Sequence, residues 1–439
     1  MQALMPLFLF LTLFMLLLLG YPVAFTLGGV SFLFGLMTFG INFFNLLPMR
    51  IWGIMTNYVL IAVPLFIYMG VMLEKSGLAE ELLETMALLF GRMRGGLAIS
   101  VVVVGAMLGA STGIVGATVV TMGLLSLPTM LKRGYNPELA TGTISASGTL
   151  GQIIPPSIVL VLLGSILNVS VGDMFIGAII PGSILVILYL LWIIILSIIK
   201  PELVPSMPGE ELARFRGKAM VRRVIQAFIL PFILVLAVLG SIFAGIASPT
   251  EAAAVGAFGA TLLTILHGRF TLRTLQDVMR ETTLLTCMVF IILVGATSFG
   301  LVFRGMRGDL QLTHLILNAN LGPHAFLALV MLVIFIAGFF IDFIEITFII
   351  VPVVAPIFQK MGVDLLWIGI LIAMNLQTSF LTPPFGFSLF YLKGVAPPSI
   401  TTGHIYRGIV PFVIIQLIGL TITILFPKTV QWLPRVVFK

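Results

Sequence analysis

Charged residues and cysteines are scarce in this chain of 439 residues. Only 9% of its residues are charged, against about 25% in an average soluble domain. The single cysteine, Cys287, excludes an intrachain disulfide. Because 60% of the residues are hydrophobic and the apolar runs are continuous rather than alternating, we expect a helical membrane protein. The same pattern excludes a β-barrel and a sizeable soluble domain.

Catalytic and nucleotide-binding motifs are missing as well. The histidines are scattered without metal-ligand spacing, and there is no Walker A, nucleophile-elbow, H-E-x-x-H or C-x-x-C pattern. We therefore predict that the protein is not an enzyme and has no ATP site of the Walker type. The net charge of +7 does not indicate nucleic-acid binding, because basic residues usually mark the cytoplasmic loops of a membrane protein.

Long apolar segments dominate what is present. Those able to span a bilayer as helices are residues 4–20, 22–39, 51–73, 137–165, 175–199, 224–246, 250–267, 281–303, 363–394 and 405–427. Two more stretches, 96–130 and 322–359, are interrupted near the middle by small or polar residues, and we expect each to form a re-entrant hairpin. The first segment runs on into the second without an A-x-A-like cleavage site, so we expect a retained helix and not a signal peptide.

Two of these segments carry a double proline. Each pair is expected to break its helix and to free main-chain carbonyls just before it, because proline lacks an N–H and crowds the preceding turn. At membrane depth freed carbonyls are tolerated only against protein or a water-filled cavity, where they suit a cation. The prolines are Pro155, Pro156, Pro383 and Pro384, and the carbonyls are those of Gly151, Gln152, Ser379 and Phe380.

Prolines and glycines recur in register, which indicates a duplicated chain. A shift of 228 places Pro128 on Pro356, Gly134 on Gly362, Asn136 on Asp364, and the first double proline on the second. A shift of 227 places Pro22 on Pro249 and Gly29 on Gly256. We therefore predict a first repeat over residues 1–200, a linker over 201–223 and a second repeat over 224–439.

Each repeat is expected to hold about five spanning helices, one re-entrant hairpin and one broken helix. An odd number of spans turns the second repeat over, so the predicted fold is an all-α polytopic membrane protein with two inverted-topology repeats. With both termini periplasmic, 16 basic residues lie on inner loops and 7 on outer loops, as the positive-inside rule favours. The linker is expected to form an amphipathic helix on the cytoplasmic face, or a plain tether.

Polar clusters inside apolar surroundings are the candidate sites. Residues 109–121 place small residues and hydroxyls at the expected tip of the first hairpin. Ser111 and Thr112 are expected where the chain turns and a helix begins, a position that suits an anion or cation, or simply close helix packing. In the second hairpin, Asp342 and Glu345 lie in a strongly apolar stretch, where an ionisable group indicates a helix cap or a cation ligand. Ser248, Pro249 and Glu251 form a capping-box pattern, for which we expect a structural role.

At these motifs the sequence resembles, essentially end to end, the large membrane subunit of tripartite ATP-independent periplasmic (TRAP) transporters. The motifs are G-A-S-T-G-I-V-G-A-T (109–118), G-T-L-G-Q-I-I-P-P-S (148–157), A-S-P-T-E-A-A-A-V-G (247–256), G-F-F-I-D (338–342) and L-T-P-P-F-G (381–386). The resemblance implies a secondary transporter in a bacterial or archaeal inner membrane, which uses a sodium gradient to import organic acids by an elevator motion. It also implies two partners, a small four-helix membrane subunit, expected as a separate polypeptide, and a periplasmic substrate-binding protein.

The resemblance further implies which residues bind ions and substrate. The cation candidates are Ser111, Thr112, Gly113, Thr149 and Gln152 in the first half, and Gly338, Asp342, Gln377, Thr378 and Thr382 in the second. The substrate is expected between the halves, near Ser111, Ser147, Ser157 and Asn375. No arginine is obviously placed there, so helix-end N–H groups and bound cations are expected to neutralise a carboxylate.

Two alternatives remain open at this stage. One is a sodium symporter for divalent anions that works without a binding protein. The other is an intramembrane enzyme with Asp342 and Glu345 as an acid pair, although two residues three apart on one helix do not form a facing dyad.

Overall fold

The computed structural model describes residues 5–112, 115–207, 218–318, 321–383 and 386–437. In its first half the elements are α1 (Met5–Leu18), α2 (Val23–Phe39), η2 (Ile41–Leu46), α3 (Leu47–Met55), η3 (Tyr58–Ile61), α4 (Ala62–Lys75), α5 (Leu78–Phe90), α6 (Gly96–Thr112), α7 (Val115–Lys132), α8 (Pro137–Thr149), η4 (Leu150–Gln152), α9 (Ile158–Leu167) and α10 (Val171–Ile199).

The rest of the described chain, which begins with the linker, also has only helices as regular elements. Its elements are η5 (Pro201–Leu203), α12 (Lys218–Val224), the π-helical turn η6 (Ile225–Ile229), α13 (Leu230–Phe243), α14 (Pro249–Leu266), α15 (Leu272–Gly305), α16 (Gly308–Asn318), α17 (Pro323–Ala337), α18 (Phe343–Ile349), α19 (Val351–Lys360), α20 (Leu365–Leu381), α21 (Phe387–Val395), α22 (Thr402–Leu425) and α23 (Lys428–Val437).

Every regular element in the described ranges is a helix. Seven helices there are long and apolar enough to cross a membrane, or eight if α18 and α19, which meet at a bend of 49°, count as one span. The prediction of an all-α polytopic membrane protein is therefore confirmed. Of the helices in the two hairpins, only α7 is long enough by itself to cross the membrane. The re-entrant form of the hairpins α6–α7 and α17–α19 therefore stays a prediction.

The residues that recur in the sequence have the same structural role in both halves. Gly134 and Gly362 both adopt a positive φ, of 78° and 71°, which glycine tolerates and other residues resist. Two residues later, Asn136 and Asp364 are the N-caps of α8 and α20, and each side chain accepts a hydrogen bond from a first-turn N–H, at 3.0 and 2.9 Å. Positions that are 228 residues apart thus share local backbone geometry as well as similar residue types.

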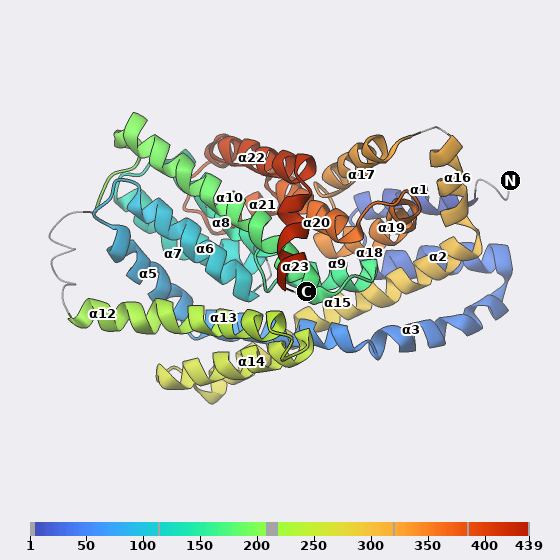
Figure 1. Cartoon of the computed structure of the whole chain (residues 1–439), viewed down its shortest axis with the longest axis horizontal. Helices are drawn as coiled ribbons and strands as arrows, with labels where there is room; N and C mark the ends of the chain where they lie inside the picture. Colours follow the sequence, from blue (N-terminus) through green and yellow to red (C-terminus); the bar gives the residue numbers. More distant parts are fainter. Residues whose placement is uncertain (1–4, 113–114, 208–217, 319–320, 384–385, 438–439) are drawn as a thin grey trace.

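Packing between the halves is reciprocal. Helix α8 lies against α22, while its counterpart α20 lies against α10. Likewise α7 packs on α21 and α19 packs on α9, and α2 packs on α15 while α14 packs on α4. In Figure 1, α3, α13 and α14 run along one edge, α10, α17 and α22 along the opposite edge, and the broken helices lie between them.

The centre of the molecule is unusually polar for its burial. All residues of α8 from Leu139 to Thr149 are buried, as are all residues of α20 from Trp367 to Leu381. A helix buried on every side needs small side chains where its neighbours approach. Gly142 of α8 provides such a point, since a Cβ there would collide with the Gly408 carbonyl of α22.

The structure corrects some boundaries that the apolar pattern predicted. The expected span 51–73 is divided, because α3 ends at Met55 and the Asn57 side chain accepts from the Val59 N–H at 3.0 Å, which caps a new helix. The apolar pattern also did not predict α5, α16 and α23, because these helices are too short or too amphipathic to resemble membrane spans.

The linker differs from the expected amphipathic helix over residues 201–207. This stretch forms the single turn η5 and then a strap, in which Val204 accepts from the Gly95 N–H at 3.0 Å and Met207 donates to the Gly91 carbonyl at 2.8 Å. Pro201 and Pro205 explain the lack of a helix, because proline removes backbone donors. Residues 208–217 lie outside the described ranges, and α12 resumes a helix at Lys218.

Ion pairs gather at helix ends that the charge pattern assigns to the inner side. They are Lys75–Glu281 at 3.0 Å, Arg269–Glu81 at 3.6 Å, Arg407–Glu138 at 3.7 Å, and Arg223–Glu84. Each joins two different helices or their connecting turn, so these inner ends are held together by charge as well as by apolar contact. Their grouping agrees with the predicted topology.

Gly142→Ala should test the crossing of α8 and α22. The added methyl forces two backbones apart, so we expect a loss of about 1–3 kcal/mol, seen as a lower thermal unfolding midpoint of the purified protein. Gly29→Ala in α2, where nothing lies within 4 Å of the new Cβ, is the matched control. It is expected to change stability by less than about 1 kcal/mol, and equal midpoints in the two variants would contradict the crossing.

Candidate functional site at the two helix breaks

The first break lies between α8 and α9. Helix α8 ends at Thr149, the 3-10 turn η4 follows, and α9 begins at Ile158. Pro155 and Pro156, joined by a cis peptide bond, lie in the irregular stretch between them. The break predicted from this double proline is therefore confirmed.

The second break lies between α20 and α21. Helix α20 ends at Leu381, Thr382 has extended backbone angles, and α21 begins at Phe387. Pro383 lies in this interval, whereas Pro384 lies outside the described residues. The second predicted break is also confirmed. The two breaks follow α8 and α20, which correspond to each other at the 228-residue offset.

Carbonyls that the sequence analysis expected to be free are partly satisfied by their own turns. The Gln152 carbonyl accepts from the Ser157 hydroxyl at 2.8 Å, and the Ser379 carbonyl accepts from the Thr382 N–H at 3.1 Å. The expectation is wrong for these two groups, because a buried backbone acceptor takes the nearest local donor. Ser157, a substrate candidate, therefore closes the first break from within.

In the described part of the chain, a hydrogen bond joins the two broken helices close to their breaks. The Gln377 amide donates to the Thr149 hydroxyl at 3.4 Å, and the two residues are 228 positions apart. They are thus counterparts in the two repeats, which meet where α20 contacts α8 and η4. This contact brings two predicted cation ligands from opposite halves to one place.

Buried polar atoms without partners surround that contact. Within the described residues, both side-chain atoms of Gln152 and the Oε1 of Gln377 have no hydrogen-bond partner, nor does the Ser145 hydroxyl. All three side chains are fully buried. Because an unpaired buried polar group costs about 1–3 kcal/mol, such a cluster is expected only where a ligand, ion or water completes it.

Glycines let the hairpins approach the breaks closely. A Cβ at Gly109 of α6 would lie 2.5 Å from the Gly151 nitrogen, and one at Gly105 would lie 2.6 Å from the Ser147 Cβ. The Ser147 hydroxyl itself donates to the Ile144 carbonyl at 3.0 Å. Ser147, a second substrate candidate, therefore serves the packing of α8 on α6.

In the second half, Gly338 ends α17 and packs directly on the Ser379 side chain. Asp342 is the N-cap of α18, with its carboxylate accepting from the Phe343 N–H at 2.7 Å. Glu345 accepts from the Asp342 N–H at 3.1 Å, which completes a capping box. The helix-cap interpretation of Asp342 is thus confirmed, as is the capping box of Ser248 with Glu251.

The other candidates of the second half lie on or next to α20. Asn375 donates to the Met331 carbonyl of α17 at 2.7 Å. The Thr378 hydroxyl donates to the Met374 carbonyl at 2.9 Å, and that of Thr382 to the Thr378 carbonyl at 2.8 Å. A hydroxyl that donates within its helix keeps its lone pairs for another partner.

The hairpin candidates of the first half are described only in part. Ser111 and Thr112 belong to the last turn of α6, but their side chains are outside the described part, and Gly113 is outside it altogether. The sequence analysis placed Ser111 and Thr112 where a helix begins. Instead they end the first arm, and α7 begins at Val115.

The sequence analysis did not identify two residues of α21 that lie near the candidate site. The Ser388 hydroxyl donates to the Ser145 carbonyl of α8 at 3.1 Å. The Tyr391 ring lies against Gly116 of α7, 2.9 Å from where its Cβ would stand. Tyr391 therefore packs on the first hairpin. The missed signal was a pair of polar residues three apart on the helix after the second break.

Comparison with known proteins agrees with these motifs. Residues 10–429 match the family model described as the DctM component of the tripartite ATP-independent periplasmic transporter. The C4-dicarboxylate TRAP transporter large permease protein DctM of Vibrio cholerae is 32% identical over 94% of both chains. The ectoine/5-hydroxyectoine TRAP transporter large permease protein UehC of Ruegeria pomeroyi is 31% identical over 95% of both chains.

A solved structure shares the fold. The YdaH transporter of Alcanivorax borkumensis matches with a TM-score of 0.63 over 90% of both chains, at 16% sequence identity. The resemblance inferred from the motifs is confirmed by the sequence relatives, which are named as transporter permeases and not as enzymes.

Gln152→Leu tests the unpaired amide. In buffer without sodium or acid, replacing an unsatisfied buried amide with an apolar group of similar size should raise the unfolding midpoint, by about 1 kcal/mol in stability. Gln416→Leu is the matched control, because Gln416 is equally buried and its Oε1 also has no partner in the described ranges, but its amide N–H donates to the Tyr189 hydroxyl at 2.8 Å. That variant should lose about 1–3 kcal/mol. Equal losses in both variants would show that Gln152 is satisfied after all.

Proposed function

The chain belongs to the family of the DctM component of tripartite ATP-independent periplasmic transporters, and from this membership we propose that it carries an organic acid into the cell. It is the large permease subunit of such a system and a multi-pass membrane protein. The acid is inferred from the C4-dicarboxylate relative, whereas the ectoine relative leaves the exact substrate open.

One observation carries the proposal. The two helix breaks meet through Gln377 and Thr149, and the amide oxygens of Gln152 and Gln377 are left buried without partners. Amide and hydroxyl oxygens are ligands for hard cations. A transport site needs such groups at a helix break shared by two repeats. The Gln416 oxygen of α22 is also buried without a partner among the described residues, so it is the location of Gln152 and Gln377 at and beside the breaks that supports the proposal.

Sodium is the proposed coupling ion. The proposed ligands are the oxygens of Thr149, Gln152 and Gln377, together with the Asp342 carboxylate of the second hairpin. None of the residues named at the breaks is basic. A bound cation would therefore supply the positive charge that a substrate carboxylate requires.

An elevator motion of inverted repeats is the proposed mechanism. The moving body would comprise the hairpins and broken helices, α6–α9 and α17–α21, and the scaffold α1, α2, α4 and α13–α15. Reciprocal packing of the two halves supports this division. The Thr121 hydroxyl of α7 donates to Glu74 of α4 at 2.7 Å, a contact between the two bodies that has to break when they slide.

The proposed partners are a small four-helix membrane subunit and a periplasmic binding protein. The proposal is tested by uptake in proteoliposomes with both partners supplied, while sodium, membrane potential and candidate acids are varied one at a time. We expect uptake only with an inward sodium gradient and the binding protein. Uptake by this chain alone would favour the symporter that needs no binding protein, and uptake indifferent to sodium would exclude sodium coupling.

Asp342→Asn separates the cap from an ion-binding role. Asparagine caps a helix about as well as aspartate, so the unfolding midpoint should be preserved. Loss of the charge should raise the sodium concentration for half-maximal uptake about tenfold, equivalent to about 1.4 kcal/mol.

Asp364→Asn is the matched control, because Asp364 caps α20 at its exposed end. It should leave the sodium dependence unchanged. An unchanged sodium dependence in Asp342→Asn as well would restrict Asp342 to capping.

A further inference from the structure

A cavity of about 650 Å³ lies away from the helix breaks. One wall is formed by α3 and α15, and the other by the end of α9 together with α18 and α19. Thr149, Gln152 and Gln377 do not line it. Its volume falls in the usual range of small-molecule sites, roughly 300–1,000 Å³.

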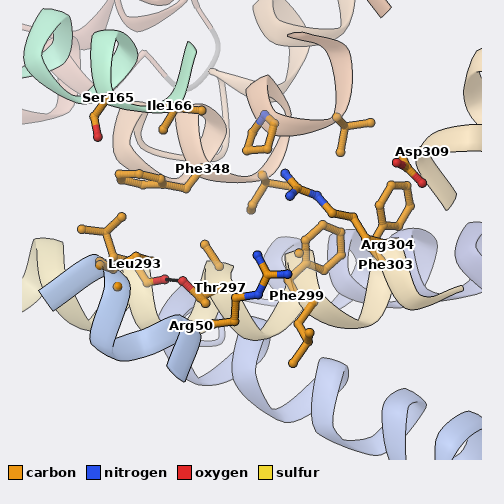
Figure 2. Close-up of a pocket in the computed structure, with 18 of the residues that line it drawn as sticks. Arg50, Ser165, Ile166, Leu293, Thr297, Phe299, Phe303, Arg304, Asp309 and Phe348 are labelled. Atoms are coloured by element: carbon orange, nitrogen blue, oxygen red, sulfur yellow. Dashed lines mark hydrogen bonds between the residues drawn. The ribbon is translucent and has the colours of Figure 1, made fainter. Parts of the chain in front are cut away.

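Two arginines reach into this cavity from the same wall. Figure 2 shows the side chains of Arg50, from α3, and Arg304, from the last turn of α15, extending into the space beside Phe348. Among the residues that the structure describes, neither guanidinium has an ion-pair or hydrogen-bond partner. Two adjacent positive charges repel, and an anion between them would remove that repulsion.

The only acidic residue in the described lining is Asp309. Figure 2 shows it at the edge of the cavity, with the Arg304 guanidinium directed away from it. Asp309 therefore leaves the cavity with a net positive charge. Arg50 and Arg304 are among the 7 basic residues that the positive-inside rule assigns to the outer loops, and their shared cavity is consistent with that prediction.

The opposite wall is apolar with a polar corner. Phe348, Pro352 and Val353 form most of it, while Ser165 at the end of α9 accepts from the Asn57 amide at 3.3 Å. The cavity thus combines two guanidinium groups with an apolar surface. That combination suits a small molecule with an oxyanion at one end and a carbon skeleton at the other, because guanidinium pairs bind carboxylates in a bidentate geometry.

We propose that this cavity is a second binding site, in which Arg50 and Arg304 bind the carboxylate of a small organic acid. The choice of a carboxylic acid as ligand rests on the proposed function. The walls belong to the scaffold on one side and to the proposed moving body on the other. An acid bound here lies at the boundary between the two, outside the helix-break site.

Succinate binding to the purified chain tests the proposal without any transport measurement. The chain is placed in nanodiscs of phosphatidylcholine at constant ionic strength, without sodium, and its unfolding midpoint is followed as succinate is raised. We expect a saturable rise in the midpoint for the wild type. Arg50→Gln and Arg304→Gln should each weaken it at least about tenfold, whereas Gln152→Leu should retain it.

Arg307→Gln is the matched control, because Arg307 follows α15 by two residues but does not line the cavity. It should respond to succinate like the wild type. Arg50→Lys and Arg304→Lys keep the charge and should retain part of the response, which separates loss of binding from loss of folding.

Three results would overturn the proposal. The first is an undiminished succinate response in both glutamine variants. The second is loss of the response in Gln152→Leu alone, which would place the acid at the helix breaks. The third is an arginine-dependent stabilisation by phosphatidylglycerol nanodiscs with no response to succinate, which would make a lipid phosphate the occupant. Arginine-dependent succinate binding without any uptake would instead contradict the proposed function and leave this site intact.

Discussion

Backbone polar groups in the membrane interior have no water with which to form hydrogen bonds, and this constraint determines the structure at the centre of the molecule. Breaking a helix there is tolerated only if neighbouring elements cover the break completely. The chain achieves this with glycines that bring α6 against the first break and α17 against the second, at Gly109 and Gly338. Local donors, such as the Ser157 hydroxyl, satisfy main-chain acceptors. Among the described side chains, the Gln152 and Gln377 amides keep atoms without partners, and these are the groups proposed to bind a ligand.

The 228-residue correspondence between the halves gives this arrangement its geometry. Each half supplies one broken helix, and each broken helix packs on the long helix of the other half, α8 on α22 and α20 on α10. Counterparts therefore meet near the line between the halves, as Gln377 and Thr149 do. A site built on that line is shared, so neither half can form it alone. The apolar exterior of the scaffold is free to differ between the halves without disturbing it.

Local signals in the sequence predicted local structure well. Double prolines predicted both breaks, and Asn136, Asp342 and Asp364 begin helices as their residue types indicate. Prediction failed where the outcome depended on distant contacts. Which donor satisfies the Ser379 carbonyl depends on the shape of a turn, and Tyr391 contacts the first hairpin only because the tertiary fold brings Gly116 beneath its ring. Similarly, Arg50 and Arg304 are 254 positions apart in the chain, and only packing of α3 on α15 unites them.

The two proposed sites differ in charge, and this difference determines which of them an acid would occupy first. At the breaks the available groups are neutral oxygens and amides, with Asp342 nearby, so an acid is repelled until cations are bound. In the cavity, Arg50 and Arg304 attract an acid without any cation. Under the two proposals, an acid arriving first would favour the cavity, and it would favour the breaks only after ions had bound there. Coupling of ions to substrate would then follow from electrostatics, because the helix-break site would accept the anion only in the presence of a counter-charge.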